Sequence, residues 1–516
     1  MLKEADQAYI ELNAAEGAGR RAFVAGLGAS GRVSAAYLAR RGWRVAAADT
    51  RAAVAGLDEW RAQNPAVEVT LGGLPAELPP GTDLLVMSPG ISPWHGPAAA
   101  LAGDARAKRV PVAGEIELFA QHLAHLGRTS GYKPAVIGVT GTNGKTTTTT
   151  LTAKIGEASG RSTIAAGNIG PNALLELEKA EAAGRLPDLW VLELSSFQLD
   201  TTHTLHCDAA ALLNITEDHI DWHGSMEAYA RAKARIFSKD TVRVGNREDA
   251  LALEMTTADL EDPKLLRTFG ASRPKHPGEF GLELAAHASQ GLWLASMDEM
   301  EVEILYLPEG ELLIRGRHNT MNALAALALT AAVGIDRLVA VGVLRTYRGE
   351  PHRVELVRTV AGRDFIDDSK GTNVGAVGAA VMGLAAEGRP IRILLGGDGK
   401  GQDFTPLAEV LKGRVAAAAL IGRDAEAIGR AVANDSMVVE RFATLEDAVE
   451  WLWSTSAPGD QILLSPACAS WDMFRDYAER SGRFKAAAAA IAAREEPKAS
   501  EKAGQTKEAG RPEGAA

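Results

Sequence analysis

The stretch Val136-Ile-Gly-Val-Thr-Gly-Thr-Asn-Gly-Lys-Thr-Thr147 joins an apolar run to a glycine turn that ends in a lysine and threonines. This order predicts a β-strand, a tight turn and the start of a helix, where backbone N–H groups and the positive helix end converge on one point. Such a point suits a polyphosphate, with Lys145 on the terminal phosphates and the Thr146 hydroxyl on Mg²⁺. The strict P-loop pattern requires glycine where Val139 stands, so the alternative of a glycine turn that binds no ligand remains. The residues predicted to bind the nucleotide are Gly141, Thr142, Asn143, Gly144, Lys145, Thr146 and Thr147.

Length and charge limit the classes of protein to which the chain could belong. Its 516 residues are enough for about three or four domains. The 66 acidic residues outnumber the 55 basic ones, and the formal charge of -11 argues against a general nucleic-acid binder. Cys207 and Cys468 indicate neither a disulfide framework nor a thiolate zinc site. Because the N-terminus lacks a signal-peptide core and no apolar run reaches the roughly 20 residues that cross a bilayer, we expect a cytoplasmic protein without membrane contacts.

The first part of the chain alternates strand-like and helix-like segments. Strands are expected at 22–26, 43–48 and 83–87, with a helix that ends near Arg41. This rhythm predicts a parallel sheet whose ligands bind at the carboxyl ends of the strands. Residues 127–134 are rich in turn-forming residues and are expected to be a linker.

Two further α/β units follow, so we expect an α/β protein of three domains: an N-terminal Rossmann-like domain, a central P-loop ATPase-like domain and a C-terminal Rossmann-like domain. Near 258–312 the sequence is irregular and charged, and we assign it no structure. The expected strands of the later units are 189–194, 209–214, 363–366, 392–395, 416–421 and 461–464, and a helix is expected over 317–333. The expected boundaries are 1–128, 129–349, 350–494 and a polar, disordered tail at 495–516.

The N-terminal segment Gly26-x-Gly28-x-x-Gly31, with Asp49 at the end of the next strand, is similar to a dinucleotide-binding fingerprint. Three interpretations are compatible with it: a nicotinamide enzyme, a βα turn without a ligand, and a site for another nucleotide. In the last case a uridine diphosphate would lie over the helix start, with Asp49 and Arg51 near the base. A simple dehydrogenase has no need of the second phosphate loop at 141–146, which argues against hydride transfer.

A second group of polar residues follows the strands next to the phosphate loop. Glu193 ends an apolar run, and burial of a lone carboxylate is costly unless a partner or a metal compensates it. We therefore predict that Glu193 holds Mg²⁺. The segment from Asn214 to Gly224 is rich in acids and histidines, and His219 is a candidate ligand, although its acids could equally cap a helix. Lys233 stands between alanines, a poor place for a solvated side chain.

Taken together, these motifs resemble those of the Mur ligases, the ATP-dependent amino-acid ligases of peptidoglycan synthesis. The resemblance runs from about residue 20 to 493. Its later motifs are similar to those of the D-glutamate-adding branch of the family. The matching segments are the phosphate loop, the Glu193 strand, Asn214-Ile-Thr-Glu-Asp-His-Ile-Asp221, Arg317-His-Asn-x-x-Asn322, Pro351-His-Arg353, Asp367-Asp-Ser-Lys-Gly-Thr-Asn373, Gly396-Gly-Asp-Gly-Lys400 and Ser465-Pro-Ala-Cys-Ala-Ser-Trp-Asp-x-Phe474.

The resemblance implies a reaction in which ATP phosphorylates the carboxylate of UDP-N-acetylmuramoyl-L-alanine. The amine of D-glutamate then attacks the acyl phosphate, and ADP and phosphate are released. Phosphorylation supplies the leaving group that a carboxylate lacks, and Lys145 and Mg²⁺ offset the charge on the transferring phosphoryl group. The family further implies two Mg²⁺ ions and a Lys233 carbamylated by CO₂, which would ligate one of them together with His219.

The resemblance also implies roles for individual residues. Asn322 and Asp368 would contact the nucleotide and Arg353 its phosphates. Lys370, with a catalytic role as well, would hold the D-glutamate carboxylates together with Thr372, Lys400 and Ser470, because cations and hydroxyls are suitable donors to carboxylates. The residues expected to bind the UDP-linked substrate are Ser30, Asp49, Thr50, Arg51, Ser88, Pro89, Gly90 and Asn168.

The chain departs from the family pattern in its extra N-terminal residues, the 258–312 stretch, the polar tail, and Gly371 and Trp471 beside substrate motifs. Another Mur ligase or a folylpolyglutamate synthetase is the alternative within the same class, but a folate enzyme should lack the UDP-type first domain. A nucleotide-binding regulatory module without ligase activity is an alternative from another class. We expect a monomer that acts on small molecules.

Overall fold

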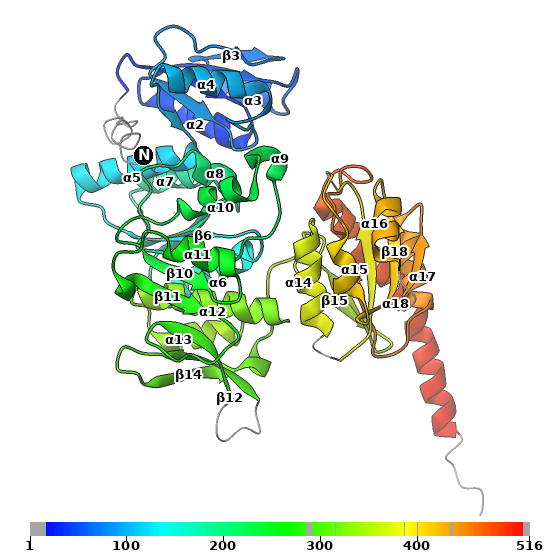
Figure 1. The fold of residues 1–516 in the computed structure, drawn as a ribbon. Helices are drawn as coiled ribbons and strands as arrows, with labels where there is room; N and C mark the ends of the chain where they lie inside the picture. Colours follow the sequence, from blue (N-terminus) through cyan, green and yellow to red (C-terminus); the bar gives the residue numbers. More distant parts are fainter. Residues whose placement is uncertain are drawn as a thin grey trace, which may run out of the picture. The chain divides into compact units, whose positions relative to one another are not determined.

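The computed structural model describes residues 17–284, 291–314, 316–385, 388–399, 401–433 and 437–508. The chain forms two compact units. One contains residues up to 312 together with 321–347, and the other contains 313–320 together with residues from 348 onward. Three separate sheets, two in the first unit and one in the second, carry the fold (Figure 1). This arrangement confirms the predicted α/β class and its three sheet-based parts.

The first sheet consists of five parallel strands in the order β3-β2-β1-β4-β5. Gly31 in the first helix is required by close packing, because a Cβ there would lie 1.8 Å from the carbonyl oxygen of Gly26. The predicted βα turn therefore brings helix and strand into direct backbone contact. The elements are β1 (Arg21–Ala25), α2 (Ala29–Arg40), β2 (Arg44–Asp49), α3 (Leu57–Gln63), β3 (Val67–Leu71), β4 (Leu84–Met87), η1 (Gly96–Ala98), α4 (Ala99–Ala107) and β5 (Val112–Ala113).

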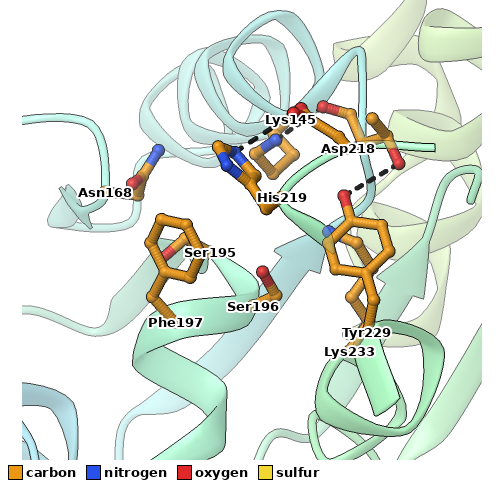
Figure 2. A pocket seen from close by; sticks show the side chains of 10 residues that line it. Lys145, Asn168, Ser195, Ser196, Phe197, Asp218, His219, Tyr229 and Lys233 are labelled. Atoms are coloured by element: carbon orange, nitrogen blue, oxygen red, sulfur yellow. Dashed lines mark hydrogen bonds and ion pairs between the residues drawn. The ribbon is translucent and has the colours of Figure 1, made fainter. Parts of the chain in front are cut away.

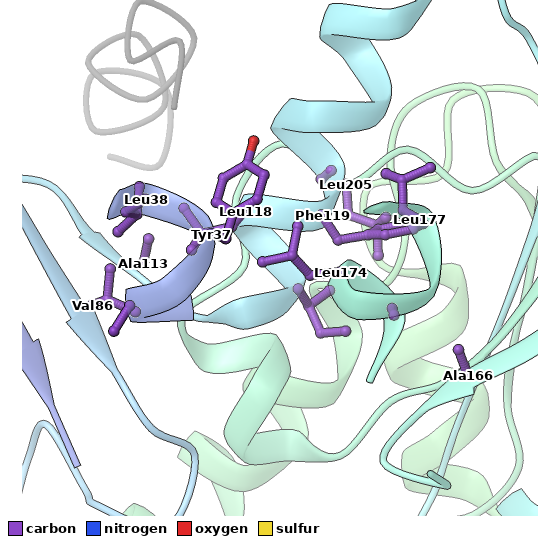
Figure 3. Packing of buried hydrophobic residues seen from close by; sticks show 14 of the residues in the cluster. Tyr37, Leu38, Val86, Ala113, Leu118, Phe119, Ala166, Leu174, Leu177 and Leu205 are labelled. Carbon is purple, nitrogen blue, oxygen red and sulfur yellow. The ribbon is translucent and has the colours of Figure 1, made fainter. Parts of the chain in front are cut away.

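Helix α5 (Glu115–Ser130) corrects the predicted linker at 127–134. The helix continues to Ser130 and ends at Gly131, whose φ of 74° is the left-handed conformation that favours glycine. One face of α5 is apolar, and Leu118 and Phe119 are fully buried. They lie in one core cluster with side chains of α2 and of α7 (Ala173–Ala182), as Figure 3 shows. The first two sheets therefore share a core, and only a few residues after Ser130 connect α5 to the next strand.

The second sheet has nine strands in the order β14-β13-β12-β11-β10-β9-β6-β8-β7. Strand β6 lies between β8 and β9, so the residues that follow these three parallel strands meet at one edge. The elements up to β10 are β6 (Ala135–Thr140), α6 (Lys145–Ala158), β7 (Thr163–Gly167), α7, β8 (Leu189–Glu193), α8 (Ser196–Asp200), β9 (Ala209–Leu212), α9 (Ile220–His223), α10 (Met226–Ala234) and β10 (Val242–Asn246).

The stretch near 258–312, left without a structural assignment, extends this sheet. β12 and β13 pair antiparallel, as do β13 and β14, and their apolar residues Leu282, Leu294 and Leu307 are buried. Only β12 alternates apolar and polar residues, whereas β13 and β14 lack this alternation, and charged, glycine and proline residues dominate the rest of the stretch. The elements are α11 (Ala250–Thr257), η2 (Pro263–Leu265), β11 (Leu266–Phe269), β12 (Glu279–Leu284), β13 (Leu292–Met297), β14 (Glu303–Pro308), η3 (Glu309–Glu311), α12 (Arg317–Ala332) and α13 (Arg337–Leu344).

The second unit contains a six-stranded sheet in the order β15-β16-β20-β17-β18-β19, parallel except for β15. Its elements are β15 (Glu355–Val360), β16 (Arg363–Asp367), α14 (Val374–Ala385), β17 (Ile391–Gly396), α15 (Pro406–Leu411), β18 (Val415–Ile421), α16 (Ala425–Val432), β19 (Val438–Arg441), α17 (Leu445–Ser454), β20 (Gln461–Leu464) and α18 (Tyr477–Glu508).

Helix α18 continues through most of the segment predicted to be a disordered tail. Its backbone is helical to Glu508, and residues 509–516 of that prediction lie outside the described residues. Alanine, lysine and glutamate dominate this segment, and all three have high helix propensity. In the part of the chain that the structure describes, no helix combines the length and apolar content needed to cross a bilayer.

Candidate functional site

The predicted phosphate loop lies between the end of β6 and the start of α6. Gly141 and Gly144 have φ values of 150° and 83°, so the turn depends on glycine at both positions. A Cβ on Gly144 would lie 2.4 Å from Oδ1 of Asn322. Lys145, the first residue of α6, donates from Nζ to the carbonyl oxygens of Gly141 at 2.9 Å and Thr142 at 2.8 Å. The lysine thus folds over the turn at the helix N-terminus, as a phosphate-binding lysine requires.

Neighbouring strands and helices hold the loop in place. The Asn143 backbone N–H donates to Oδ1 of Asn214 at 2.8 Å, and Nδ2 of Asn214 donates back to the Asn143 carbonyl oxygen at 3.0 Å. The Thr142 hydroxyl lies 3.0 Å from the hydroxyl of Tyr229. Thr146 and Thr147 are buried in the first turn of α6. Asn214 was given no role from the sequence, and Tyr229 was not singled out. Nothing in the sequence marks Tyr229 except its position on the same predicted helix as Lys233.

A cavity of about 110 Å³ opens beside this loop. The side chains around it come from the loop after β6, the end of β7, the start of α8, the residues before α9, and α10 (Figure 2). The structure thus brings together five of the predicted residues with five for which the sequence gave no role. The lining residues are Thr142, Lys145, Asn168, Ser195, Ser196, Phe197, Asp218, His219, Tyr229 and Lys233.

Glu193 is the last residue of β8 and pairs in register with Val139 of β6, directly before the phosphate loop. The residue is 2% exposed. Asn168 donates from Nδ2 to its Oε1 at 2.7 Å, whereas Oε2 is buried and has no hydrogen-bond partner within the described residues. A buried carboxylate oxygen without a donor is costly. Together with the Thr146 hydroxyl it provides the hard oxygen donors that Mg²⁺ prefers, so the residues fit this ion.

Lys233 is 1% exposed, and its Nζ donates to the Gly141 carbonyl oxygen at 2.8 Å and lies 4.5 Å from the ring centroid of Tyr229. Burial, and then the charge of Lys145, hold the pKa of Lys233 well below its usual value, although Asp218 acts in the opposite direction. His219 has a φ of 56°, and its Nε2 lies 3.5 Å from Oδ2 of Asp218. The cavity therefore combines a lysine with a depressed pKa and an imidazole beside the phosphate loop.

The candidates in the first domain follow the strands of the first sheet or begin the helix after β1. Asp49 accepts from the Leu27 backbone N–H at 2.7 Å and from the Arg51 guanidinium at 2.7 Å and 2.8 Å. The hydrogen bond from Arg51 is the main reason why the pKa of Asp49 is lowered. Ser30 accepts a bond from Asn172, directly before α7, at 3.2 Å. Thr50, between Asp49 and Arg51, is exposed, and Ser88, Pro89 and Gly90 follow the neighbouring strand β4.

Most candidates of the second unit lie on two loops, 367–372 and 465–470. Burial raises the pKa of Asp368 to about 7, and the Ser465 hydroxyl donates to it at 2.6 Å. Gly371 fits the tight packing here, because a Cβ would lie 2.4 Å from Oδ2 of Asp368. The buried Arg480 links the loops through the carbonyl oxygens of Ser369 at 2.9 Å and Cys468 at 3.1 Å. Sequence reasoning missed Arg480, because an arginine in a charged helix gives no signal of burial.

Three of the predicted amino-acid-binding residues belong to these loops. Nζ of Lys370 lies 5.0 Å from the ring centroid of Tyr477, Ser470 is 3% exposed, and Thr372 follows Lys370 by two residues. Lys400 lies outside the described residues. Arg353 stands between His352 and Val354, which both have positive φ values of 69° and 47°, a conformation that costs energy for non-glycine residues. Asn322 belongs to the first unit, where its Oδ1 is 3.4 Å from the Thr148 hydroxyl.

Comparison with protein families covers most of the chain. Residues 20–114 match the MurD-like N-terminal domain of Mur ligases, residues 139–330 the Mur ligase middle domain, and residues 352–468 the Mur ligase glutamate ligase domain.

Relatives agree over nearly the whole length. A protein from Ralstonia nicotianae named UDP-N-acetylmuramoylalanine–D-glutamate ligase is 47% identical over 490 residues, which are 91% of this chain and 97% of that protein. A protein of the same name from Burkholderia mallei is 46% identical, with 91% of this chain and 96% of the relative covered.

Solved structures share the fold at low sequence identity. UDP-N-acetylmuramate-alanine ligase MurC from Thermotoga maritima superposes with a TM-score of 0.53 at 19% identity, covering 90% of this chain and 98% of that one. MurF ligase from the same organism, solved with ADP, gives 0.51 at 17% identity, covering 88% and 92%. The domain matches, the relatives and the fold agree, and the chain belongs to the Mur ligase family.

Proposed function

We propose that the chain joins D-glutamate to UDP-N-acetylmuramoyl-L-alanine with ATP, releasing ADP and phosphate. The observation that carries this proposal is the cavity beside the phosphate loop, which Lys145 and the buried Lys233 line together with Asn168. Asn168 in turn binds the carboxylate of Glu193, whose other oxygen has no hydrogen-bond partner within the described residues. Substrate identity rests on the relatives named UDP-N-acetylmuramoylalanine–D-glutamate ligase. The chemistry in the cavity and the names of the relatives thus support the same reaction.

The first step activates the carboxyl group of the UDP-linked substrate. The residues of the loop, Gly141 to Thr147, hold the triphosphate through backbone N–H groups and the start of α6. Lys145, which now donates to two carbonyl oxygens, would exchange them for phosphate oxygens and stabilise the charge that moves onto them. Mg²⁺, held by Thr146 and Glu193, would supply Lewis-acid stabilisation of the phosphate oxygens. A carboxylate oxygen attacks the γ-phosphorus, the bond to the ADP oxygen breaks, and an acyl phosphate results.

The second step forms the amide bond. The free amine of D-glutamate attacks the acyl carbon, the carbonyl electron pair moves to oxygen, and its return expels phosphate while the amine proton is lost. Lys370, Thr372, Lys400 and Ser470 are proposed to bind the two carboxylates of D-glutamate, and Asn322, Arg353 and Asp368 to contact the nucleotide. Ser30, Asp49, Thr50, Arg51, Ser88, Pro89 and Gly90 are proposed to bind the UDP group and Asn168 the acyl end.

Lys233 is proposed to react with CO₂ and, with His219, to complete a second Mg²⁺ site. Its depressed pKa supports this, because only the uncharged amine attacks CO₂. Enzyme supplied with ¹³C-bicarbonate should show a carbamate ¹³C resonance that Lys233→Met lacks. An identical resonance in both proteins would exclude Lys233 as the modified residue.

An amino-acid panel tests the whole proposal. Purified protein with ATP and UDP-N-acetylmuramoyl-L-alanine should release phosphate when D-glutamate is added. Equal rates with L-lysine or meso-diaminopimelate would reject the assignment in favour of another ligase of the family. We also propose a cytoplasmic monomer with the boundaries 1–128, 129–349 and 350–494, and light scattering during gel filtration would test the oligomeric state.

A further inference from the structure

Ser196 stands out among the residues that line the cavity. It is the first residue of α8, three positions after Glu193, and is 2% exposed. Its hydroxyl lies 2.9 Å from Nε2 of His223, the last residue of α9. Neither residue has a role in the proposed reaction so far. The Ser196 hydroxyl therefore borders the cavity while an imidazole on its other side binds it, and this arrangement suggests a function for the pair.

His223 is held firmly in place by aromatic neighbours. It is 6% exposed, and its ring centroid lies 4.4 Å from that of Trp222, 5.3 Å from Tyr229 and 5.7 Å from Phe197. Such packing fixes the plane of the ring, so the position of Nε2 is fixed as well. By contrast, the hydroxyl of the adjacent Ser195 is engaged with Gln198 in a capping box. Of the two adjacent serines, Ser196 is therefore the one whose hydroxyl His223 orients at the cavity wall.

The position of the proton on the His223 ring determines the direction of its hydrogen bond with Ser196. Nε2 is the ring nitrogen that faces the serine hydroxyl. A neutral ring protonated on Nε2 donates to Ser196 Oγ and leaves the serine proton free to point into the cavity. The opposite tautomer would leave lone pairs facing the anionic carboxylate and phosphate of the proposed reaction, which is unfavourable. Anionic substrates thus favour the arrangement in which Ser196 is a donor.

We propose that Ser196 donates a hydrogen bond to the reacting carboxyl group of the acyl substrate, and that His223 is the positioning residue that orients it. This inference rests on the proposed function and adds a contact to the same site. The bond strengthens as negative charge builds on the acyl oxygen when the amine attacks, so it acts mainly on kcat. The pair supplies a hydroxyl donor, which adds no positive charge beside Lys145.

The test is a double-mutant cycle followed by phosphate release. Ser196→Ala should lower kcat by about 10²-fold and change the KM for ATP by less than about twofold, as expected for the loss of one oxyanion donor. His223→Leu should cost at least about 10-fold, and the double variant no more than the worse single variant, because the two residues act as one unit. His223→Gln keeps an N–H donor and should recover most of the loss.

Controls separate this role from a structural one. Ser225→Ala removes an exposed serine that caps α10, outside the cavity, and should leave kcat unchanged. A Ser196→Ala variant with kcat within about threefold of the wild type, or losses that multiply in the double variant, would overturn the inference.

A measurement that needs no catalytic turnover tests the role of His223 separately from the proposed function. In ¹⁵N-histidine-labelled protein, with His223 assigned from its absence in His223→Gln, the ring should carry a proton on Nε2 at pH 7. A ring protonated on Nδ1 alone would overturn the proposal. A wild-type protein that releases no phosphate with the proposed substrates would instead refute the proposed function.

Discussion

Gly144 allows the geometry of the phosphate loop to be tested by one added methyl group. Its φ of 83° is left-handed, and a Cβ would lie 2.4 Å from Oδ1 of Asn322. Gly160, just beyond the other end of α6, has nearly the same φ of 85° but no atom within 4 Å of its added Cβ. The two glycines of one helix thus separate backbone strain from steric conflict.

The magnitudes follow from this geometry. Left-handed strain costs an alanine roughly 1–2 kcal/mol at either position. At Gly144 ordinary contact begins at 3.4 Å, so Asn322 must also move by about 1 Å, away from its place beside the loop. Misplacement of a binding group by that distance can cost as much as about 10²-fold in rate. We therefore expect Gly144→Ala to raise the KM for ATP at least about tenfold, while Gly160→Ala leaves it within about twofold.

The assay is phosphate release at varied ATP concentrations, with thermal unfolding of both variants measured in parallel. Both proteins should lose stability, and Gly144→Ala should lose about 1 kcal/mol more, because it carries steric conflict in addition to strain. If the two variants show the same KM for ATP, the loop does not position Asn322 for the nucleotide, and the reasoning is wrong.

Three further predictions address the lysine, a buried acid and the shared core. Lys145→Ala should reduce turnover by at least about 10³-fold with little change in melting temperature, and turnover near the wild-type level would remove Lys145 from the mechanism. Burial raises the pKa of Glu115 to about 7. Because the folded state then binds more protons than the unfolded state between about pH 4.5 and 7, wild-type stability should fall as the pH rises through that range. Glu115→Gln keeps an acceptor for the Leu174 N–H but cannot ionise, so its stability should not fall with pH in this way. Relative to the wild type, the change in unfolding free energy between pH 4 and pH 8 should differ by up to about 3 kcal/mol, which melting curves at the two pH values would measure. Phe119→Ala should lower the free energy of unfolding by about 3–5 kcal/mol, because the ring is fully buried between the first two sheets. Leu338 is 73% exposed, and Leu338→Ala should change that free energy by less than about 0.5 kcal/mol. Equal effects of the two substitutions in melting curves would contradict the shared core.

The sequence was most informative where one local pattern decides the structure. The glycine turn at 141–144 and the apolar run before Glu193 are short-range signals, and both lie where they were expected, next to each other across β6 and β8. The strand rhythm of the first domain likewise predicted β1, β2 and β4 within a residue or two.

Features decided by tertiary contacts could not be predicted in this way. The end of α5 was taken for a linker because its glycines are turn signals, but burial of its apolar face extends the helix to Ser130. Strands β12 to β14 were missed because β13 and β14 lack regular alternation and because charged, glycine and proline residues dominate the rest of the stretch. The pairing of Ser196 with His223, 27 residues later, depends on how α8 and α9 pack, which no local pattern specifies.

A crystal soaked with ADP and Mg²⁺ would test most directly whether the turn after β6 binds the nucleotide. We predict phosphate density over the backbone between Gly141 and Thr146, with Lys145 turned from its two carbonyl oxygens toward it and a metal ion next to Glu193. Nucleotide density elsewhere on the molecule, with that turn free of ligand, would contradict the account.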